Sequence, residues 1–338
     1  MKRIKAKSAR AQEADALVSH LQKYFADALG MLSSELGENK AFVPIEWFRE
    51  EGKSGGGVRY VARDDKLFDR ASVNVSQVQY ESDESRALSS ATALSTIIHP
   101  RNPHAPSIHM HISWTEMKEG RGYWRMMADL NPSIFYAKDK ALFEKRLQLL
   151  APEVYEEASA QGDKYFYIPA LGRNRGVSHF YLENFTAKDD VQMAKRLIEG
   201  VIDTYIEIIS KRMTQAVSEE ERAEQLAYHT LYLFQVLSLD RGTTSGLLVH
   251  DENDVGIMGS VPSHINTALL HAWKETVGAP QDLLIDAILG CLDSSGAVDD
   301  AQKVCLAKVT REHYKKHPKA LELQASGYVS VPTVQNHR

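Results

Sequence analysis

The sequence contains few cysteines and no long apolar run. Cys291 and Cys305 are the only two cysteines among 338 residues. Two are too few for a disulfide framework, so we expect reduced thiols in an intracellular, cytoplasmic protein. No apolar run approaches the ~18 residues that a membrane-spanning helix needs. These shortages exclude a disulfide-stapled secreted domain and a membrane-spanning protein.

Neither sign of charge dominates. The chain carries 40 Lys and Arg against 45 Asp and Glu, a net charge of −5. Because the signs are interspersed, general nucleic-acid binding is not expected. Residues 1–10 are basic, but no apolar segment follows them and acids appear at Glu13 and Asp15. We expect these residues to begin a helix rather than to form a targeting peptide.

What is present fits one large globular protein. Apolar residues make up 43% of the chain, which at this length suffices for a substantial core. The sequence shows no linker, repeat or low-complexity segment. We therefore expect a single domain over residues 1–338.

Hydrophobic periodicity predicts an α+β fold. Alternation predicts strands over residues 58–63, 72–78, 94–99, 108–117, 123–130 and 179–185. Helical spacing predicts helices over residues 11–36, 191–209, 218–237, 281–292 and 299–317, and a helical region over roughly residues 137–167. Because the strands cluster early without regular βαβ alternation, we expect an antiparallel sheet covered by helices.

The most informative segment is residues 95–116, which reads as strand, stiff turn, strand. Alternation places the polar side chains of each strand on one face, namely those of Ser95 and His99 in the first strand and those of Ser107, His109, His111 and Ser113 in the second. Burying such a face against an apolar core would be costly. We interpret it as the wall of a binding site.

Three histidines of this segment admit two interpretations. In one interpretation, His99, His109 and His111 together form a metal site. His99 and His109 are the stronger candidates for its ligands. No Asp or Glu at matching phase completes such a site. We therefore expect no metal, and histidines that bind substrate or transfer protons.

Prolines and glycines flank further candidate residues. The turn HPRNPHAP is stiff and either positions His99 and Arg101 or forms a rigid surface loop. Glycines beside Arg175 and Arg241 would let their guanidinium groups approach a carboxylate. The run GKSGGG lacks the spacing of a phosphate loop, so nucleotide binding is not predicted.

A fourth alternating run carries opposite charges on one strand face. Arg125 and Asp129 share that face of residues 123–130. They could form a structural ion pair, or they could contact a substrate. The residues alone leave both possibilities open.

Taken together, these motifs resemble the oxygen-dependent coproporphyrinogen III oxidase family. The resemblance rests on EWFREEGKSGGG, FDRASVNVS, STIIHPRNPHAPSIHMHI, ADLNP, DKYFYIPALGRNRGV, DRGTTSGL and SVP, in that order over residues 41–262. It implies a large flat antiparallel sheet flanked by helices on both faces, a cleft for a tetrapyrrole, and a homodimer. The implied reaction converts two propionates of coproporphyrinogen III to vinyl groups with O₂, and no established organic cofactor takes part.

The resemblance also implies roles for individual residues. His109 matches a proposed proton donor, and Asp129 matches an acid thought to face the pyrrole nitrogens. The implied substrate contacts, including those suggested by strand phase, are Ser95, His99, His111, Ser113, Arg125, Arg175 and Arg241.

The chain departs from the family pattern at several positions around the cleft. Ser113 stands where the family has an arginine, residues 125–127 replace three glycines, and an acidic stretch at residues 251–254 replaces a Gly-Gly-Arg loop. Arg125 is a candidate substitute for the missing guanidinium. Two hypotheses follow, a divergent oxidase of this family or a paralogue with the same fold and a different ligand.

Overall fold

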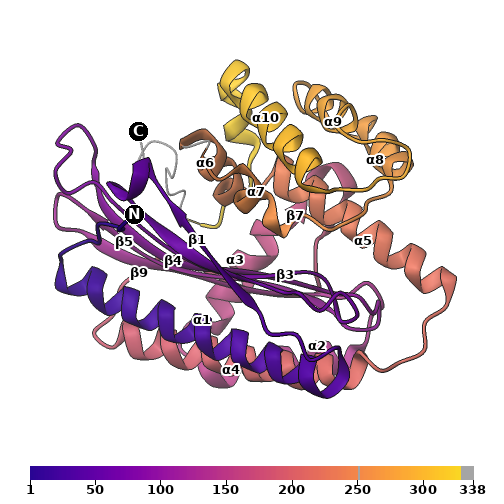
Figure 1. The fold of residues 1–338 in the computed structure, drawn as a ribbon, viewed down its shortest axis with the longest axis horizontal. Helices are drawn as coiled ribbons and strands as arrows, with labels where there is room; N and C mark the ends of the chain where they lie inside the picture. The colour runs from indigo at the N-terminus through magenta and orange to yellow at the C-terminus, as the bar shows by residue number, and fades with distance from the viewer. Residues whose placement is uncertain (250–251, 329–338) are drawn as a thin grey trace.

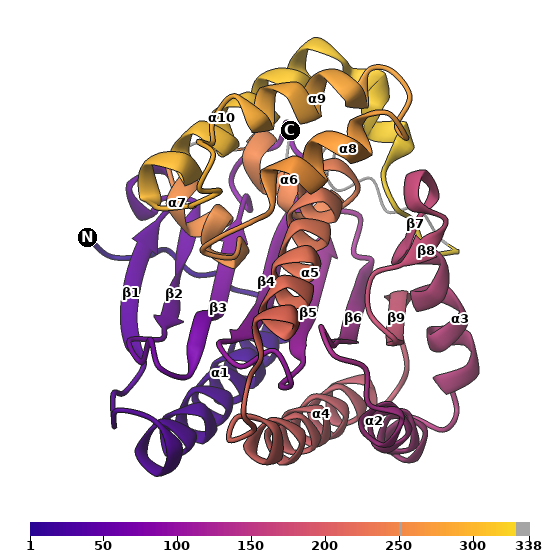
Figure 2. The ribbon, with the colours of Figure 1, turned by 90° about the vertical axis from the view of Figure 1, so that its right-hand side faces the viewer.

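The computed structural model describes residues 1–249 and 252–328. A seven-stranded antiparallel sheet lies at its centre, in the strand order β1-β2-β3-β4-β5-β6-β9 (Figure 2). Its strands are β1 (Val43–Phe48), β2 (Gly55–Val61), β3 (Phe68–Gln79), β4 (Leu88–Pro100), β5 (Ser107–Met117), β6 (Gly122–Asn131) and β9 (Ser178–Phe185). Two-residue strands β7 (Tyr167–Ile168) and β8 (Arg173–Asn174) form a separate small ladder.

Three long helices cover one face of the sheet (Figure 1). They are α1 (Ala9–Leu36), α2 (Ala137–Leu150) and α4 (Asp190–Arg212). Side chains such as Ile108, Met110 and Trp124 point toward these helices and are buried with them in the larger apolar cluster. This half of the molecule follows the expected pattern, since alternate residues of each strand face opposite sides.

The later part of the chain covers the other face (Figures 1 and 2). Its helices are α5 (Glu219–Ser238), α6 (Arg241–Val249), α7 (Asp254–Ile257), α8 (Thr267–Lys274), α9 (Gln281–Leu289) and α10 (Asp300–Lys316), with short 3₁₀ turns η3 (Met258–Ser260) and η4 (Pro318–Leu323). A second apolar cluster holds these elements together. Helix α3 (Tyr155–Tyr165) packs against edge strand β9. The α+β fold with helices on both faces of an antiparallel sheet is confirmed.

Strand β1 was not predicted, because VPIEWF lacks clear alternation and its side chains are half-buried or exposed. The helical region expected over residues 137–167 consists of two helices, α2 and α3, separated at residues 151–154. Pro152 lies in that break, and proline cannot donate the backbone hydrogen bond that a continuous helix requires.

The proline-rich turn after β4 is tied into the fold rather than free at the surface. Asn102 donates to the carbonyls of Met213 and Gln215 at 3.2 and 2.9 Å, just after α4. The buried His104 contacts the Ala216 carbonyl through Nε2 at 2.9 Å. The turn therefore fastens one end of the sheet to the connection between α4 and α5.

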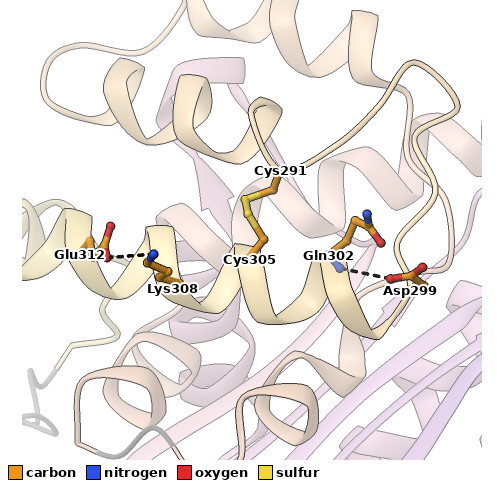
Figure 3. Close-up of a disulfide and its surroundings, with 6 residues drawn as sticks. All are labelled: Cys291, Asp299, Gln302, Cys305, Lys308 and Glu312. Carbon is orange, nitrogen blue, oxygen red and sulfur yellow. Dashed lines mark hydrogen bonds and ion pairs between the residues drawn. A yellow bond between two sulfur atoms is a disulfide. The ribbon is translucent and has the colours of Figure 1, made fainter.

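The expectation of two reduced thiols was wrong. Cys291 and Cys305 form a disulfide, with their Cα atoms 5.7 Å apart (Figure 3). Cys291 lies just after α9 and Cys305 lies within α10, so packing between two neighbouring helices brings the sulfur atoms together. The number of cysteines alone could not predict that these two lie close together in the fold. Across the described part of the chain, no helix is long and apolar enough to cross a membrane.

Candidate active site

A cavity of about 240 Å³ lies between the sheet and the helices α5 to α7. Its floor is formed by strands β3 to β6, and its other walls come from α3, β9, α5, α6 and the α7–η3 segment. The lining residues with polar or ionisable groups include Ser72, Asn74, Ser95, His109, His111, Arg125, Tyr165, Tyr181, Tyr232 and Asp240. Three of the residues singled out for substrate contact, Ser95, His111 and Arg125, line this cavity, as does His109.

Cross-strand pairing arranges the floor in rows. One row crosses the sheet through Arg59, Asn74, Ser95, His111 and Met127. The next row passes through Val61, Ser72, Ile97, His109 and Asp129. Directly paired residues point to the same face, so distant segments meet on one polar surface.

Asp129 lies behind His109 rather than on the cavity wall. Its side chain is fully buried, and Asp129 Oδ2 accepts a hydrogen bond of 2.7 Å from Arg175 Nη2. Asn131 Nδ2 donates to the same oxygen at 2.6 Å. Arg175 is equally buried and donates through Nη1 to Gln235 Oε1 at 2.7 Å. The expectation that Asp129 faces a ligand therefore differs from its position here.

This buried group keeps its charges. Burial alone would raise the pKa of Asp129, but Arg175 and His109 bring that pKa down to about 2. Burial opposes the charge of Arg175 as well, and Asp129 keeps the pKa of the guanidinium above its ordinary value. The pair is thus a buried, ionised salt bridge beside His109.

The same pair orients the ring of His109. Arg175 Nη2 lies 3.1 Å from His109 Nδ1, and Asp129 Oδ1 lies 3.4 Å from that nitrogen. Because a guanidinium only donates, the Arg175 contact makes Nδ1 an acceptor and leaves the proton of a neutral ring on Nε2. When Nδ1 is protonated, Asp129 can accept from it. The two partners serve both protonation states of a ring that lines the cavity.

His111 is held by two hydroxyl groups. Its Nδ1 lies 2.9 Å from Ser95 Oγ, and its Nε2 lies 3.0 Å from Ser113 Oγ. Burial, with the positive charge of Arg125 and the neighbouring His109, lowers the pKa of His111 to about 3. A neutral imidazole whose two nitrogens are both hydrogen-bonded is better suited to positioning Ser95 than to transferring protons.

His99 does not reach the cavity. It is fully buried, with Nδ1 2.8 Å from Ser107 Oγ and Nε2 3.2 Å from the Ser260 carbonyl. The rings of Tyr228, His229 and Tyr232 surround it. Burial and the neighbouring His229 lower the pKa of His99 well below its ordinary value. Its position makes it a packing and hydrogen-bonding residue between sheet and α5.

Arg175 and Arg241, two of the implied substrate contacts, have carboxylate partners within the protein. Arg175 pairs with Asp129, as described above. Arg241, at the start of α6, donates to Glu183 of β9 and lies 3.4 Å from the hydroxyl of Tyr181. Neither arginine lines the cavity. Their charges are compensated before any ligand arrives.

Sequence reasoning missed Asp240, the carboxylate that does line the cavity. Asp240 Oδ1 accepts from the Thr243 backbone N–H at 2.7 Å, and Oδ2 accepts from Tyr165 Oη at 3.1 Å. Burial raises the pKa of Asp240, but His109 and the Thr243 N–H outweigh burial and lower it. The signal that could have found it is its place before Arg241 and Gly242, where an aspartate is a preferred cap for a following helix.

A metal does not fit the residues present. Over residues 1–249 and 252–328, no group of three or more His, Cys, Asp or Glu is arranged to hold a metal ion. His99 and His109, the candidate ligands, are engaged with different partners, Ser107 and Arg175. We derive no step through a metal.

Comparison with known proteins agrees with the motifs. The profile of a family described as coproporphyrinogen III oxidase matches residues 13–290. The chain is 26% identical to the mitochondrial oxygen-dependent coproporphyrinogen-III oxidases of Rattus norvegicus and Homo sapiens, in each case over 68% of its own length. It is 26% identical to the Drosophila melanogaster oxygen-dependent coproporphyrinogen-III oxidase over 76% of its length and 72% of the relative's.

The match spans 58% of the rat protein and 56% of the human one. The family match over residues 13–290 contains the whole sheet and most of the helices that cover it, including every residue of the cavity wall. The chain belongs to the coproporphyrinogen III oxidase family.

Proposed function

We propose that this protein catalyses the oxygen-dependent oxidative decarboxylation of coproporphyrinogen III to protoporphyrinogen IX in haem biosynthesis. Two propionates become vinyl groups. Each conversion balances as one propionate, one O₂ and one proton giving one vinyl group, one CO₂ and one H₂O₂. The proposal rests chiefly on one observation. The chain belongs to this family, and its cavity is lined by both His109 and Asp240.

The proposed roles follow from position. Asp240 is an ionised carboxylate in the cavity, where it can accept a hydrogen bond from a pyrrole N–H and favour loss of that proton. Removing this proton makes the ring electron-rich, so O₂ can add to it. The resulting peroxide then abstracts hydrogen from the propionate chain as CO₂ leaves.

His109 would handle protons near the oxygen adduct. Its Nδ1 is held from behind by Arg175 and Asp129, so its other ring nitrogen is available to the cavity. Asp129 and Arg175 are positioning residues in this scheme. Ser95 and His111 form the neighbouring polar row and orient the ligand. No organic cofactor is part of the proposal, and O₂ is the oxidant.

The direct test measures stoichiometry. Purified protein, coproporphyrinogen III labelled with ¹⁴C in its propionate carboxyl groups, and dissolved O₂ are followed together. We expect equal amounts of O₂ consumed, H₂O₂ formed and labelled CO₂ released, with two of each per protoporphyrinogen. O₂ consumption without labelled CO₂ would contradict the proposal.

A second candidate is a paralogue that binds a less anionic ligand. It is favoured by the internal pairing of Arg175 with Asp129 and of Arg241 with Glu183, which occupies two guanidinium groups. Tight binding of coproporphyrinogen III together with turnover would exclude it. The predicted homodimer and cytoplasmic location belong to the proposal as well, and light scattering of the purified protein would test the dimer.

A further inference from the structure

Arg59 is a buried arginine without a partner in the described part of the chain. It lies in the middle of β2 and is only 8% exposed. Among residues 1–249 and 252–328 its guanidinium makes no hydrogen bond and no ion pair, in contrast to Arg175 and Arg241. Buried charges are normally paired. Burial also lowers the pKa of Arg59, and Asp300 opposes this shift without reaching ion-pair distance.

The position of Arg59 relates it to the candidate active site. It stands in the same row as Asn74, Ser95 and His111, two strands from Ser95. Since neighbouring strands are about 4.8 Å apart, the Cα atoms of Arg59 and Ser95 lie roughly 10 Å apart. A ligand over Ser95 and His111 would reach Arg59 by extending across Asn74, which lines the cavity.

A glycine, Gly256, leaves room for the guanidinium of Arg59. Gly256 lines the same cavity, and a Cβ atom built on it would lie 2.1 Å from Arg59 Nη1. Any residue other than glycine would push the guanidinium away. Arg59 therefore lies directly beneath α7, at the cavity margin.

A second cavity of about 670 Å³ adjoins the first at this point. Arg59 lines it, and Ser72 lines both cavities. The segment between them is α7–η3, since Gly256 and Ile257 face the first cavity while Val255 and Gly259 face the second. The two spaces adjoin at this segment, and Arg59 lies at their junction.

The other charges of the second cavity are largely engaged with each other. Asp69 accepts from Ser263 and pairs with Arg101, and Asp300 pairs with Lys303 at 2.9 Å. Asp299 accepts from the first backbone N–H groups of α10. Asp69, Asp299 and Asp300 thus have their own donors, and Arg59 remains a buried guanidinium available to an incoming anion.

We propose that Arg59 binds a carboxylate of the ligand at the junction of the two cavities. The ligand class is a polycarboxylated small molecule long enough to span from His111 to β2. This inference rests on the proposed function, in which that carboxylate is one of the propionates of coproporphyrinogen III. Arg59 would be a specificity-determining residue at the β2 side of the ligand site.

The experiment is equilibrium binding without O₂. Wild type, Arg59→Gln, Arg59→Lys and the control Arg121→Gln are titrated with coproporphyrinogen III by anaerobic calorimetry. Arg121 is an exposed arginine just before β6 that lines neither cavity, which makes it a matched control. We expect Arg59→Gln to weaken binding roughly 10- to 100-fold. Arg59→Lys should lose less, because it keeps the charge but not the fork, and Arg121→Gln should bind like wild type.

A second ligand separates carboxylate binding from a structural effect. The tetramethyl ester of coproporphyrinogen III carries no carboxylate, so we expect wild type and Arg59→Gln to bind it equally. Arg59→Gln should also melt at or above the wild-type temperature, because it removes a buried charge that has no partner among the described residues. Equal affinities of wild type and Arg59→Gln for the free acid would overturn the inference, as would an equal loss with the ester.

The outcomes distinguish the two proposals. Arg59-dependent binding with no product in air would retain the carboxylate site and reject the proposed activity. Product formation with unchanged binding by Arg59→Gln would retain the activity and reject the role of Arg59. Absence of any binding by wild type would reject both.

Discussion

Arg175 Nη2 lies 2.7 Å from Asp129 Oδ2, and both side chains are fully buried behind the ring of His109. The guanidinium comes from the loop before β9 and the carboxylate from β6, so the pair joins two parts of the chain under one cavity wall. A buried ion pair is a weak source of net stability, but breaking it leaves an uncompensated charge. Its position under His109 indicates that it fixes the ring for function.

The pair makes a stability prediction. Asp129→Asn removes the charge that faces Arg175 and should lower the free energy of unfolding by about 3–5 kcal/mol, as measured by urea denaturation. The double variant Asp129→Leu with Arg175→Met removes both charges and should recover much of that loss. An Asp129→Asn protein as stable as wild type would show that Arg175 does not depend on the charge of Asp129 for its compensation.

His109 makes a kinetic prediction. It lines the cavity and is held from behind, so His109→Ala should lower kcat about 10²- to 10⁴-fold while the protein stays folded. His20→Ala is the matched control, because His20 is an exposed histidine paired with Glu199 on the far side of the sheet. A wild-type kcat for His109→Ala in steady-state assays would remove this residue from the mechanism.

Arg125 makes a binding prediction. Arg125 lines the cavity and is the cross-strand partner of Ser113, whereas Arg121 is exposed just before β6. Arg125→Ala should raise KM about 10-fold or more with little change in kcat, because it removes binding common to ground and transition states. Arg121→Ala should leave both parameters unchanged. If KM stays constant in Arg125→Ala, the arginine does not compensate for the family arginine missing at Ser113.

Buried neutral histidines predict a loss of stability in mild acid. Burial lowers the pKa of His229 to about 4, with Asp69 opposing the shift, and burial also lowers that of His99. Unfolded histidines, with a pKa near 6.5, bind protons that the folded protein excludes. Stability is therefore fully present above about pH 6.5 and falls as the pH drops toward 4, by up to about 1.4 kcal/mol per pH unit for each such histidine.

Urea denaturation at a series of pH values checks this sign. The free energy of unfolding of His229→Asn should decline less steeply below pH 6.5 than that of wild type. The variant lacks one histidine that takes up a proton on unfolding. A wild-type free energy of unfolding that stays constant from pH 6.5 to 4.5 would contradict the assignment of these rings as neutral.

The disulfide makes a separate stability prediction. It closes a loop between cysteines 14 residues apart, and a loop of that size contributes about 3 kcal/mol by restricting the unfolded chain. The double variant Cys291→Ser with Cys305→Ser should unfold at lower urea than wild type and should not respond to dithiothreitol. Thiol titration of denatured, unreduced wild type should find no free thiol, and two thiols per chain would contradict the bond.

The sheet and its polar face were predictable, because alternation in β5 and β6 decides which side chains share a face. His109 and His111 point into the cavity while Ile108 and Met110 point into the core, as the alternation predicted. Helices α1, α4 and α5 were also recognisable from their apolar stripes and, for α5, from the capping box of Ser218 and Glu221. Local periodicity contained this information.

Tertiary relationships were less accessible from the sequence. The placement of Asp129 behind His109 depends on Arg175, which is 46 residues away in the chain. Asp240 was missed because its role depends on α6, a helix begun by Arg241 and Gly242 and not recognised as one. Of the acidic stretch at residues 251–254, Asp251 lies outside the described residues. That Arg59 has no partner among the described residues could be seen only from the three-dimensional arrangement around it.

The most direct test of the proposed activity is incubation of the purified protein with freshly reduced coproporphyrinogen III, with and without O₂. The products are oxidised to porphyrins and separated by chromatography. The proposed function predicts protoporphyrin IX in the aerobic sample, none in the anaerobic sample, and strongly reduced product from His109→Ala. Only coproporphyrin in both samples from folded protein would contradict the account and favour the paralogue with a different ligand.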